Sequence, residues 1–349
     1  MIKKILSIGN LSGYGTSNTC FHRNYTLKRI GEVDEIDTTI IKYKFIYRIV
    51  NYLFVKRKWD IHYPSLRINT RIRNQILKKK YDLIWIDKGL LISKKTLEFI
   101  KKNSPSSILI GYSPDNMAER HNQSLHFIES FPYYDYFVTT KSYTIDKLYQ
   151  MGAKNVIFVN NAYEETFHHP YDISTEEKKR LGGKVGFIGM WEKNRCDSIL
   201  YLTKHGIPVR VWGGGKWLEY KGLYPNLTIE ETGLFTEDYN KALSAFDISL
   251  CFLRKMNNDL QTTRTMEIPA CGSLLMAERT TEHEALFKDG EEAVFFSNNE
   301  ELLEKCRYYL SHTEELKKIA KAGRERCISS GYSNNEMIKH IFTQIGILK

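Results

Sequence analysis

The segment from Asn258 to Phe296 holds the densest group of side chains suited to binding a ligand. Two carboxylates, Asp259 and Glu267, lie eight positions apart around a QTTR loop, and the stretch TMEIPACG predicts a short apolar helix that stops at Gly272. A helix N-terminus offers unpaired backbone N–H groups, and hydroxyls with a guanidinium beside it suit a diphosphate. We therefore predict a phosphate-binding site that includes Thr262, Thr263 and Arg264.

Glu267 suits a ribose, because one carboxylate can accept hydrogen bonds from two hydroxyl groups. The alternative is purely structural: the threonines cap a helix, Arg264 pairs with a nearby acid and Glu267 lies on a solvated face. We favour the ligand site, because the whole cluster precedes a turn of small residues and an apolar run, Ser273 to Ala277, that reads as a buried strand.

Three further loops of the second half follow predicted strands. The strand Val185 to Ile188 runs into Gly189, and a basic pair then enters a helix predicted from Asp197 to His205. Positive charge at this position suits a leaving diphosphate, whereas the structural alternative is a solvated helix start. The glycines after a strand ending at Trp212 would let a nucleobase approach the backbone. The candidates from these loops are Gly189, Lys193, Arg195, Gly213, Gly214 and, after the strand that ends at Leu253, Arg254.

Polar residues also follow predicted strands in the first half, where open α/β sheets place their chemistry. The strand YDLIWID ends in Asp87, and SPDNMAERHNQS after the strand Ile108 to Tyr112 carries Asp115 and His121. If the reaction needs a base near an acceptor hydroxyl, Asp115 is the first candidate, His121 the second and Asp87 the third. The glycines of GNLSGYGTSN do not have the G-x-G-x-x-G spacing of a dinucleotide site.

These motifs together resemble the GT-B glycosyltransferases of the group 1 type, most closely their spore-maturation-protein-like branch. The resemblance covers nearly the whole chain and rests on D-x7-E within EIPACG, on IGYSPDNM, on VGFIGMWEKNR and on AGRERCISSGYS. It implies that Asp259 contacts the transferred sugar, that Glu267 contacts the ribose and that the basic pair binds the diphosphate. The chain departs from the family in having Asp first and in lacking the Gly-Phe-Gly that often follows. The resemblance also places Gly13, His22 and Arg23 on the acceptor side.

Strands and helices alternate along the 349 residues, which is too long for one ordinary core. We predict an α/β protein with two doubly wound Rossmann-like domains that face each other across a cleft. The predicted parts are an acceptor domain (1–165), a linker (166–183) and a donor domain (184–330). The resemblance implies that a final helical segment (331–349) returns to the first domain.

The segment Ile40 to Tyr63 combines an apolar stripe at helical spacing with many lysines, arginines and tyrosines. One interpretation packs this stripe on the first sheet, with the lysines in solvent. The other places a basic aromatic helix on an anionic membrane, where a glycosyltransferase would meet a lipid-linked acceptor. We favour the first.

Composition sets limits on location and partners. No window of about 18 uncharged apolar residues exists, and the N-terminus reads as a strand rather than a signal peptide, so we expect a cytoplasmic protein, at most peripheral at the inner face of the membrane. Six cysteines lack any C-x-x-C spacing, and His168 and His169 are adjacent and point apart, so no metal site is predicted. The net charge of +10 favours an anionic partner.

We therefore expect transfer of a sugar from a nucleotide-diphosphate donor to a hydroxyl of a glycan or lipid-linked acceptor, in bacterial surface polysaccharide synthesis. The donor is a co-substrate, and no cofactor or nucleic acid is expected. The absence of a D-x-D tripeptide favours metal independence, and the resemblance favours retention of configuration. The alternatives are a nucleic-acid-binding protein, a nicotinamide oxidoreductase, which the missing glycine fingerprint opposes, and a catalytically silent sugar-nucleotide binder.

Overall fold

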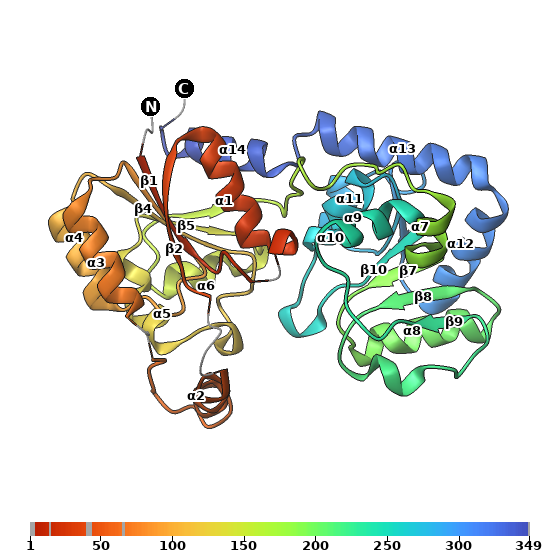
Figure 1. Ribbon diagram of the computed structural model, residues 1–349, viewed down its shortest axis with the longest axis horizontal. Helices are drawn as coiled ribbons and strands as arrows, with labels where there is room; N and C mark the ends of the chain where they lie inside the picture. Colours follow the sequence, from red (N-terminus) through yellow and green to blue (C-terminus); the bar gives the residue numbers. More distant parts are fainter. Residues whose placement is uncertain (1–3, 14, 40–43, 65–66, 348–349) are drawn as a thin grey trace. The chain divides into compact units, whose positions relative to one another are not determined.

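The computed structural model describes residues 4–13, 15–39, 44–64 and 67–347. The chain forms two compact units (Figure 1). The N-terminal unit consists of residues 1–160 and 337–349, and the C-terminal unit of residues 161–336. Each unit has a six-stranded parallel sheet with helices, which confirms the prediction of two doubly wound α/β domains.

The sheet of the N-terminal unit has the order β2-β1-β3-β4-β5-β6. Its strands are β1 (Lys4–Gly9), β2 (Glu32–Asp37), β3 (Leu83–Asp87), β4 (Ile108–Ser113), β5 (Tyr136–Thr139) and β6 (Val156–Phe158). The main helices are α1 (Thr19–Ile30), α2 (Lys44–Lys56), α3 (Ile68–Lys78), α4 (Lys94–Asn103), α5 (Leu125–Ser130) and α6 (Ile145–Gln150). Because every strand is parallel, the residues that follow β1, β3 and β4 all lie at one edge of the sheet.

The sequence EVDEID is an edge strand, β2, that our sequence analysis did not identify. Only Ile36 of this strand is buried, so the usual apolar signal is weak. Its acids serve a structural purpose: Glu32 and Asp34 both pair with Lys79, and Asp37 accepts hydrogen bonds from the backbone of Leu11 and Thr39.

The sheet of the C-terminal unit has the order β12-β11-β10-β7-β8-β9. Its strands are β7 (Gly183–Ile188), β8 (Val209–Trp212), β9 (Leu227–Ile229), β10 (Phe246–Cys251), β11 (Leu274–Glu278) and β12 (Val294–Phe296). Its helices are α7 (Thr175–Leu181), α8 (Lys193–Lys204), α9 (Thr236–Ala245), α10 (Thr263–Ala270), α11 (Thr281–Leu286), α12 (Asn299–Ser311) and α13 (Thr313–Ser329).

Strand β11 shows how this sheet is buried on both faces. Leu274 and Met276 join the apolar cluster that contains α8 and α12, whereas Leu275 and Ala277 join the cluster that contains α9 and α10. A strand alternates its side chains between faces, so a run of consecutive apolar residues is what a strand covered on both sides requires. Helix α10 therefore lies on one face of the sheet, with its start near the carboxyl edge.

The segment 166–183, which we predicted to be a linker, is part of the C-terminal unit. It contains α7, which begins with a capping box between Ser174 and Glu177. Glu177 pairs with Lys241 of α9, and Arg180 pairs with Asp238 of the same helix. Helix α7 is thus fixed to its own unit, and the polar composition that suggested a linker belongs to its exposed face.

The last helix, α14 (Asn334–Gln344), begins in one unit and continues into the other, because residues 337–349 group with the N-terminal unit. Ile338, Ile341 and Phe342 are fully buried, and the Tyr112 hydroxyl lies 3.9 Å from the sulfur of Met337. The N-terminal unit is therefore built from two separate stretches of sequence.

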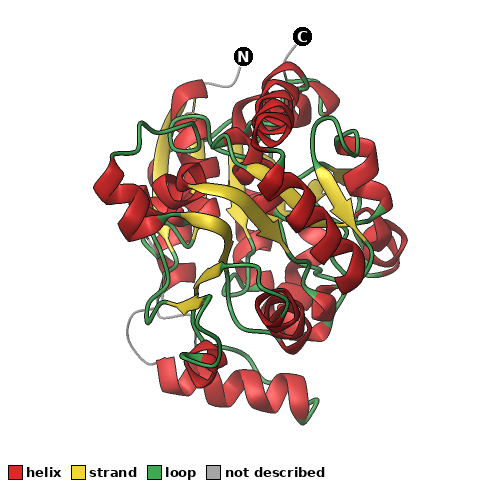
Figure 2. Ribbon diagram, turned by 90° about the vertical axis from the view of Figure 1, so that its right-hand side faces the viewer, coloured by secondary structure: helices red, strands yellow, loops and turns green. Residues whose placement is uncertain are grey.

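Helix α2 lies at the periphery of the N-terminal unit in both views (Figures 1 and 2). Val50 and Phe54 are buried, but Phe45 is 73% exposed and Ile49 is 43% exposed. The interpretation that we favoured, in which the whole stripe packs on the unit, is therefore wrong for one side of this helix. Residues 40–43 of the predicted segment lie outside the described residues.

Within the described ranges, no helix is long and apolar enough to cross a membrane. The six cysteines are unpaired and buried.

Candidate functional site

The loops after β7, β8 and β10 all begin at the carboxyl edge of the C-terminal sheet, because these strands are parallel neighbours. Helix α8 starts at Lys193, four residues earlier than predicted, so that Lys193 and Arg195 lie within its first turn. Helix α10 (Thr263–Ala270) forms where TMEIPACG predicted a short helix. The edge of this sheet therefore carries the starts of two helices and the basic residues next to them.

Three arginines, Arg195, Arg254 and Arg264, gather at this edge. Burial lowers the pKa of Arg195, and the positive charges of Arg264 and Arg254 lower it further, although Glu192 acts in the opposite direction. The carboxylate of Glu192 lies 3.4 Å from Nε of Arg254 and 3.7 Å from a terminal nitrogen of Arg195. One acid thus serves two guanidinium groups, and the cluster attracts further negative charge.

Two nitrogens of this cluster are available for a ligand. Nε of Arg195 and Nε of Arg264 are buried, and neither has a hydrogen-bond partner among the described residues. Arg195 is held in place by one terminal nitrogen that donates to the carbonyl of Met190, 3.2 Å away. A buried donor without an acceptor costs free energy, so an anion that accepts from these nitrogens would be stabilised.

The start of α10 is fixed by a chain of hydrogen bonds. The backbone N–H of Thr262 donates to the hydroxyl oxygen of Thr265, which lies 2.9 Å from Nε2 of His283. Nδ1 of His283 lies 2.7 Å from the carbonyl of Glu278. Because a carbonyl only accepts, Nδ1 carries the hydrogen and Nε2 accepts from Thr265. Burial lowers the pKa of His283, which keeps the ring neutral, as this arrangement requires.

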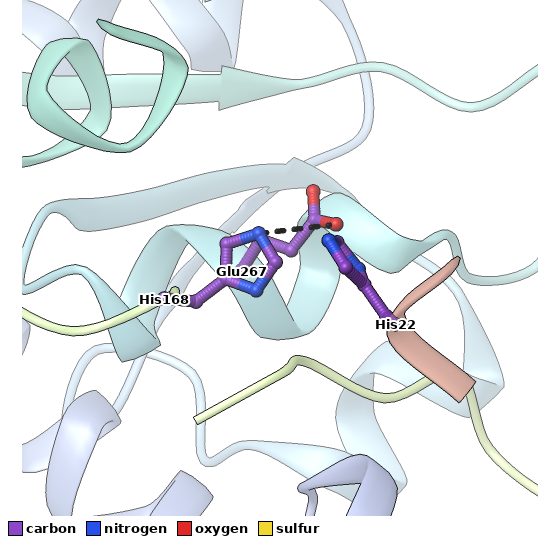
Figure 3. A group of neighbouring side chains, drawn as sticks. All are labelled: His22, His168 and Glu267. Carbon is purple, nitrogen blue, oxygen red and sulfur yellow. Dashed lines mark ion pairs between the residues drawn. The ribbon is translucent and has the colours of Figure 1, made fainter. Parts of the chain in front are cut away.

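Glu267 lies on α10 with its carboxylate buried (Figure 3). The Tyr239 hydroxyl donates a short hydrogen bond to Oε2, and Oε1 lies 3.7 Å from Nε2 of His168 (Figure 3). Burial raises the pKa of Tyr239 well above its ordinary value, and the Glu267 charge raises it further, so the phenol remains a donor. Glu267 therefore does not lie on a solvated face, as the structural alternative required.

His168 points a neutral N–H at Glu267. Burial lowers the pKa of His168 to about 3, so the ring is uncharged near neutral pH and its approach to Glu267 is not an ion pair. Its Nδ1 accepts from the backbone N–H of Glu164 at 3.0 Å, which leaves the hydrogen on Nε2. The 3.7 Å between Nε2 and Oε1 of Glu267 is too long for a good hydrogen bond.

Other predicted donor residues have different surroundings. Lys193 is 75% exposed and pairs with Asp197, so the structure separates it from the buried face on which Arg195 lies. Asp259 follows a turn in which Asn258 has φ 55°, and its backbone N–H donates to the carbonyl of Arg254 at 3.3 Å. Thr263 is the first residue of α10.

The glycine loops have a packing role. A Cβ on Gly213 would lie 2.0 Å from the carbonyl oxygen of Gly189, which already accepts a hydrogen bond from the Trp217 indole at 2.9 Å. A Cβ on Gly189 would meet the ring of Phe187, and one on Gly214 would lie 3.2 Å from the sulfur of Met190. These contacts require Gly213 whether or not a nucleobase lies against this loop.

The N-terminal unit has a cavity of about 670 Å³ at the carboxyl edge of its sheet. Its lining includes the polar side chains of Asp87, Lys88 and Asp115 and the rings of Tyr47 and Tyr63. Gly13 and Arg23 also line it. The structure thus brings four predicted residues, Gly13, Arg23, Asp87 and Asp115, to one cavity within a single unit.

Asp87 is held in a buried ion pair with Arg23, whose Nε lies 2.7 Å from the carboxylate. The Arg23 guanidinium also lies over the ring of Tyr112, 4.1 Å from its centroid. Because the Arg23 guanidinium occupies this buried carboxylate, the geometry favours a structural role for Asp87. Asp115 instead pairs with Lys88 at 2.5 Å and is partly exposed.

His121 and His22 are not among the described residues that line this cavity. His121 lies on the short turn Arg120–Asn122, where its Nε2 is 3.2 Å from the side-chain nitrogen of Asn122. His22 lies on α1, and its backbone carbonyl accepts a hydrogen bond from the Thr26 hydroxyl. The geometry of the cavity therefore does not support His121 as a base there.

Comparison with known proteins identifies the architecture. Residues 196–343 match the family described as Glycosyl transferase-like. HepE of Anabaena in complex with UDP-glucose aligns with 99% of this chain and 100% of its own at a TM-score of 0.63 and 12% identity. This chain has the GT-B glycosyltransferase fold. A glycosyltransferase from Rickettsia africae ESF-5 aligns at a TM-score of 0.64 and 14% identity, over 98% of this chain and 97% of its own.

Sucrose-phosphate synthase from Thermosynechococcus elongatus shares the GT-B fold at a TM-score of 0.63 and 12% identity, with coverage of 98% and 99%. No curated protein matches this chain in sequence. At these identities the likeness is one of fold, and the spore-maturation-protein-like branch that we expected stays a prediction.

Several residues of the site had no signal in the sequence. Tyr239, His168 and His283 come from distant parts of the chain and meet Glu267 or α10 only in the fold. Glu192 was overlooked beside the more conspicuous basic pair.

Proposed function

We propose that this protein is a glycosyltransferase that moves a sugar from a nucleotide-diphosphate donor to an acceptor hydroxyl, and that its C-terminal unit binds the donor. The observation that carries this proposal is the cluster of Arg195, Arg254 and Arg264 beside the start of α10. It supplies buried N–H donors for a diphosphate. The negative charge of the diphosphate grows as its bond to the sugar breaks. Guanidinium groups stabilise that charge in the role for which other enzymes use a metal ion.

Glu267 is proposed to accept hydrogen bonds from the ribose. One of its oxygens is held by Tyr239, and a carboxylate oxygen has a second lone pair for a ribose hydroxyl. Nε2 of His168 lies 3.7 Å from the other oxygen of the same carboxylate. HepE binds UDP and UDP-glucose, so a uridine donor is the first to test. Asp259 remains our candidate for the transferred sugar.

The acceptor is proposed to bind in the cavity of the N-terminal unit. Its polar end, with Lys88 and Asp115, suits sugar hydroxyls, while Tyr47 and Tyr63 suit a less polar group. Because Asp115 pairs with Lys88, we infer that it orients the acceptor hydroxyl. This agrees with retention of configuration, in which a donor phosphate oxygen takes the proton.

A lipid-linked acceptor is favoured by α2. Its exposed apolar residues, including Phe45, Ile46, Ile49 and Tyr52, lie among the exposed basic residues Arg48, Lys56, Arg57 and Lys58. Tyr47 of the same helix lines the cavity. An amphipathic basic helix binds anionic membranes, so we infer that the enzyme works at the inner membrane surface, in the synthesis of a surface polysaccharide or glycoconjugate.

The test is a thermal-shift screen of the purified chain against UDP, GDP, dTDP, CMP, ADP and NAD and their common sugar conjugates, with Glu267→Ala beside the wild type. Binding to the native state alone raises the apparent Tm by mass action. We expect a shift with one nucleoside diphosphate and its sugar conjugates, and no shift in Glu267→Ala. Product formation with the same donor establishes transfer.

Other outcomes would support the alternatives. A shift with NAD alone would favour an oxidoreductase. Salt-sensitive binding to DNA or RNA without any nucleotide-sugar shift would favour a nucleic-acid-binding protein. If the protein binds the donor but neither transfers nor hydrolyses it when membranes are present, the result would favour the catalytically silent sugar-nucleotide binder.

A further inference from the structure

A group of side chains able to ligate a metal lies in the N-terminal unit, next to Tyr63 of the cavity wall. His62 follows α2, and His126 and Glu129 lie three positions apart on α5, which places them on one face of that helix. One ligand atom from each residue lies within 4.8 Å of those of the other two. The His62 and His126 rings are 4.5 Å apart between centroids, and Nε2 of His62 is 2.9 Å from the Glu129 carboxylate.

The protonation of His126 points to a missing partner. Its Nε2 lies 2.9 Å from the backbone carbonyl of Tyr63, so this nitrogen carries the hydrogen and donates it. Nδ1 then presents a lone pair, yet Nδ1 is buried and has no hydrogen-bond partner among the described residues. His126 itself is only 9% exposed. A buried acceptor without a donor is rare in folded proteins and points to a bound group.

We propose that His62, His126 and Glu129 bind one Zn²⁺ ion, with water in the remaining position. A histidine that ligates zinc usually donates its other N–H to a carbonyl or carboxylate, and His126 has this arrangement through Tyr63. Two imidazoles and one carboxylate suit zinc. At metal–ligand distances of about 2.0–2.2 Å, tetrahedral ligands lie roughly 3.2–3.6 Å apart. His62 and Glu129 are 46% and 38% exposed, so both can move by the small amount required and solvent can reach the site.

The ion would join two parts of the unit that the chain itself leaves separate. The segment 57–64 has no helix or strand and carries His62 and Tyr63, the latter in the cavity wall. Asp60 of this segment already forms an ion pair with Arg120, at 3.2 Å between carboxylate and guanidinium. Zinc would add a link between the segment and α5, and would thereby hold Tyr63 in position. The inference does not depend on the proposed transferase activity.

The experiment is a Zn²⁺ titration of the full chain after removal of metal with EDTA, read by competition with a chromophoric chelator. We expect one equivalent of Zn²⁺, a rise in Tm that EDTA reverses, and visible absorption bands of four-coordinate Co²⁺ on substitution. His62→Ala and Glu129→Gln replace exposed side chains and should fold normally, but should lose stoichiometric binding. His126→Gln should lose it too, and His169→Ala, an exposed histidine of the other unit, should not.

Failure of Zn²⁺ and Co²⁺ to bind at one equivalent would overturn the proposal, and so would equal binding by wild type, His62→Ala and Glu129→Gln. Hydrogen exchange gives an independent readout. Zinc should slow exchange of backbone amides in the segment 57–64 of the wild type and leave that segment unchanged in Glu129→Gln.

Discussion

Arg195 and Arg254 share one carboxylate oxygen, Oε1 of Glu192, at 3.7 and 3.4 Å. Two cations on one anion leave positive charge at the end of β7, and Arg264 adds to it. Loops that only connected strands would gain nothing from this concentration of like charge, because it opposes folding. The arrangement is explained if a ligand supplies the missing negative charge.

Arg264→Ala and Arg195→Ala should each weaken binding of the nucleoside diphosphate. Loss of a charge-assisted hydrogen bond is worth about 1.5–3 kcal/mol, or roughly a 10- to 100-fold increase in Kd. Titration calorimetry measures the change. Arg180→Ala is the matched control, since Arg180 lies in the same unit but pairs with Asp238 on the surface. Equal affinity of the wild type and Arg264→Ala would remove this arginine from the site.

Tyr239→Phe should weaken nucleotide binding less than Glu267→Ala does, because it leaves the carboxylate in place and removes only the hydrogen bond that orients it. A buried acceptor that loses its donor should also lower the free energy of unfolding by about 1–3 kcal/mol. Chemical denaturation gives the second quantity. A double-mutant cycle with Glu267→Gln then measures the coupling, which should differ from zero.

The free energy of unfolding should fall as the pH is lowered from about 6.5 toward 3. The pKa of His168 is lowered to about 3 in the folded protein, whereas the unfolded chain takes up this proton near the ordinary value of 6.5. Between these two pH values the unfolded state binds one more proton than the folded state. The contribution of His168 to stability is therefore complete above pH 6.5 and is lost as the pH falls. The slope from this one group approaches about 1.4 kcal/mol per pH unit.

Urea denaturation at several pH values measures that slope. His168→Gln should reduce it, and His169→Ala, in which an exposed neighbour is replaced, should not. His283 contributes in the same direction, because burial also lowers its pKa. An unchanged slope in His168→Gln would show that His168 titrates normally in the folded state.

Asp87→Asn and Asp115→Asn should separate structure from function in the N-terminal unit. Removing one partner of the buried Arg23–Asp87 pair should cost about 3–5 kcal/mol of unfolding free energy. Asp115 is partly exposed in its pair with Lys88, so its replacement should change stability by less than about 1 kcal/mol. Asp115→Asn should instead raise KM for the acceptor. If Asp87→Asn raised KM and Asp115→Asn lowered stability instead, Asp87 would be the functional carboxylate.

Replacing Phe45 and Ile49 with serine should reduce binding to vesicles that contain phosphatidylglycerol, because both side chains are exposed apolar residues of α2. Each basic residue near the membrane surface adds roughly 1 kcal/mol, so binding should also weaken with added salt. Vesicle flotation measures both effects. Leu77→Ser is the control, since Leu77 of α3 is equally apolar and 65% exposed in the same unit. Equal losses would indicate a general effect of surface hydrophobicity.

Much of the fold could be predicted because short patterns of apolar residues and glycines in the sequence indicate its helices and strands. Helix α10 forms where TMEIPACG predicted a helix, since apolar residues followed by a glycine mark its course. β2 was missed because an edge strand of acids has little apolar signal. The segment 166–183 was misread because an exposed helix face has the composition of a linker.

Part of the candidate site could likewise be predicted from the sequence, and part could not. Arg264 and Glu267 could be proposed from one short segment, whereas the partners that fix their surroundings, Tyr239 and His168, lie 28 and 99 residues before Glu267. Such contacts depend on how strands are ordered in the sheet, and a single sequence does not record that order. The pairing of His62 with His126 and Glu129 was missed for the same reason.

The division of the N-terminal unit between residues 1–160 and 337–349 has a consequence for synthesis of the protein. Ile338, Ile341 and Phe342 are fully buried, and they are translated after the whole of the C-terminal unit. The C-terminal unit is a single continuous stretch, 161–336, so it can close while the chain is still on the ribosome. The N-terminal unit is therefore completed only after the C-terminal unit, and a chain cut before residue 337 has one finished domain and one open one.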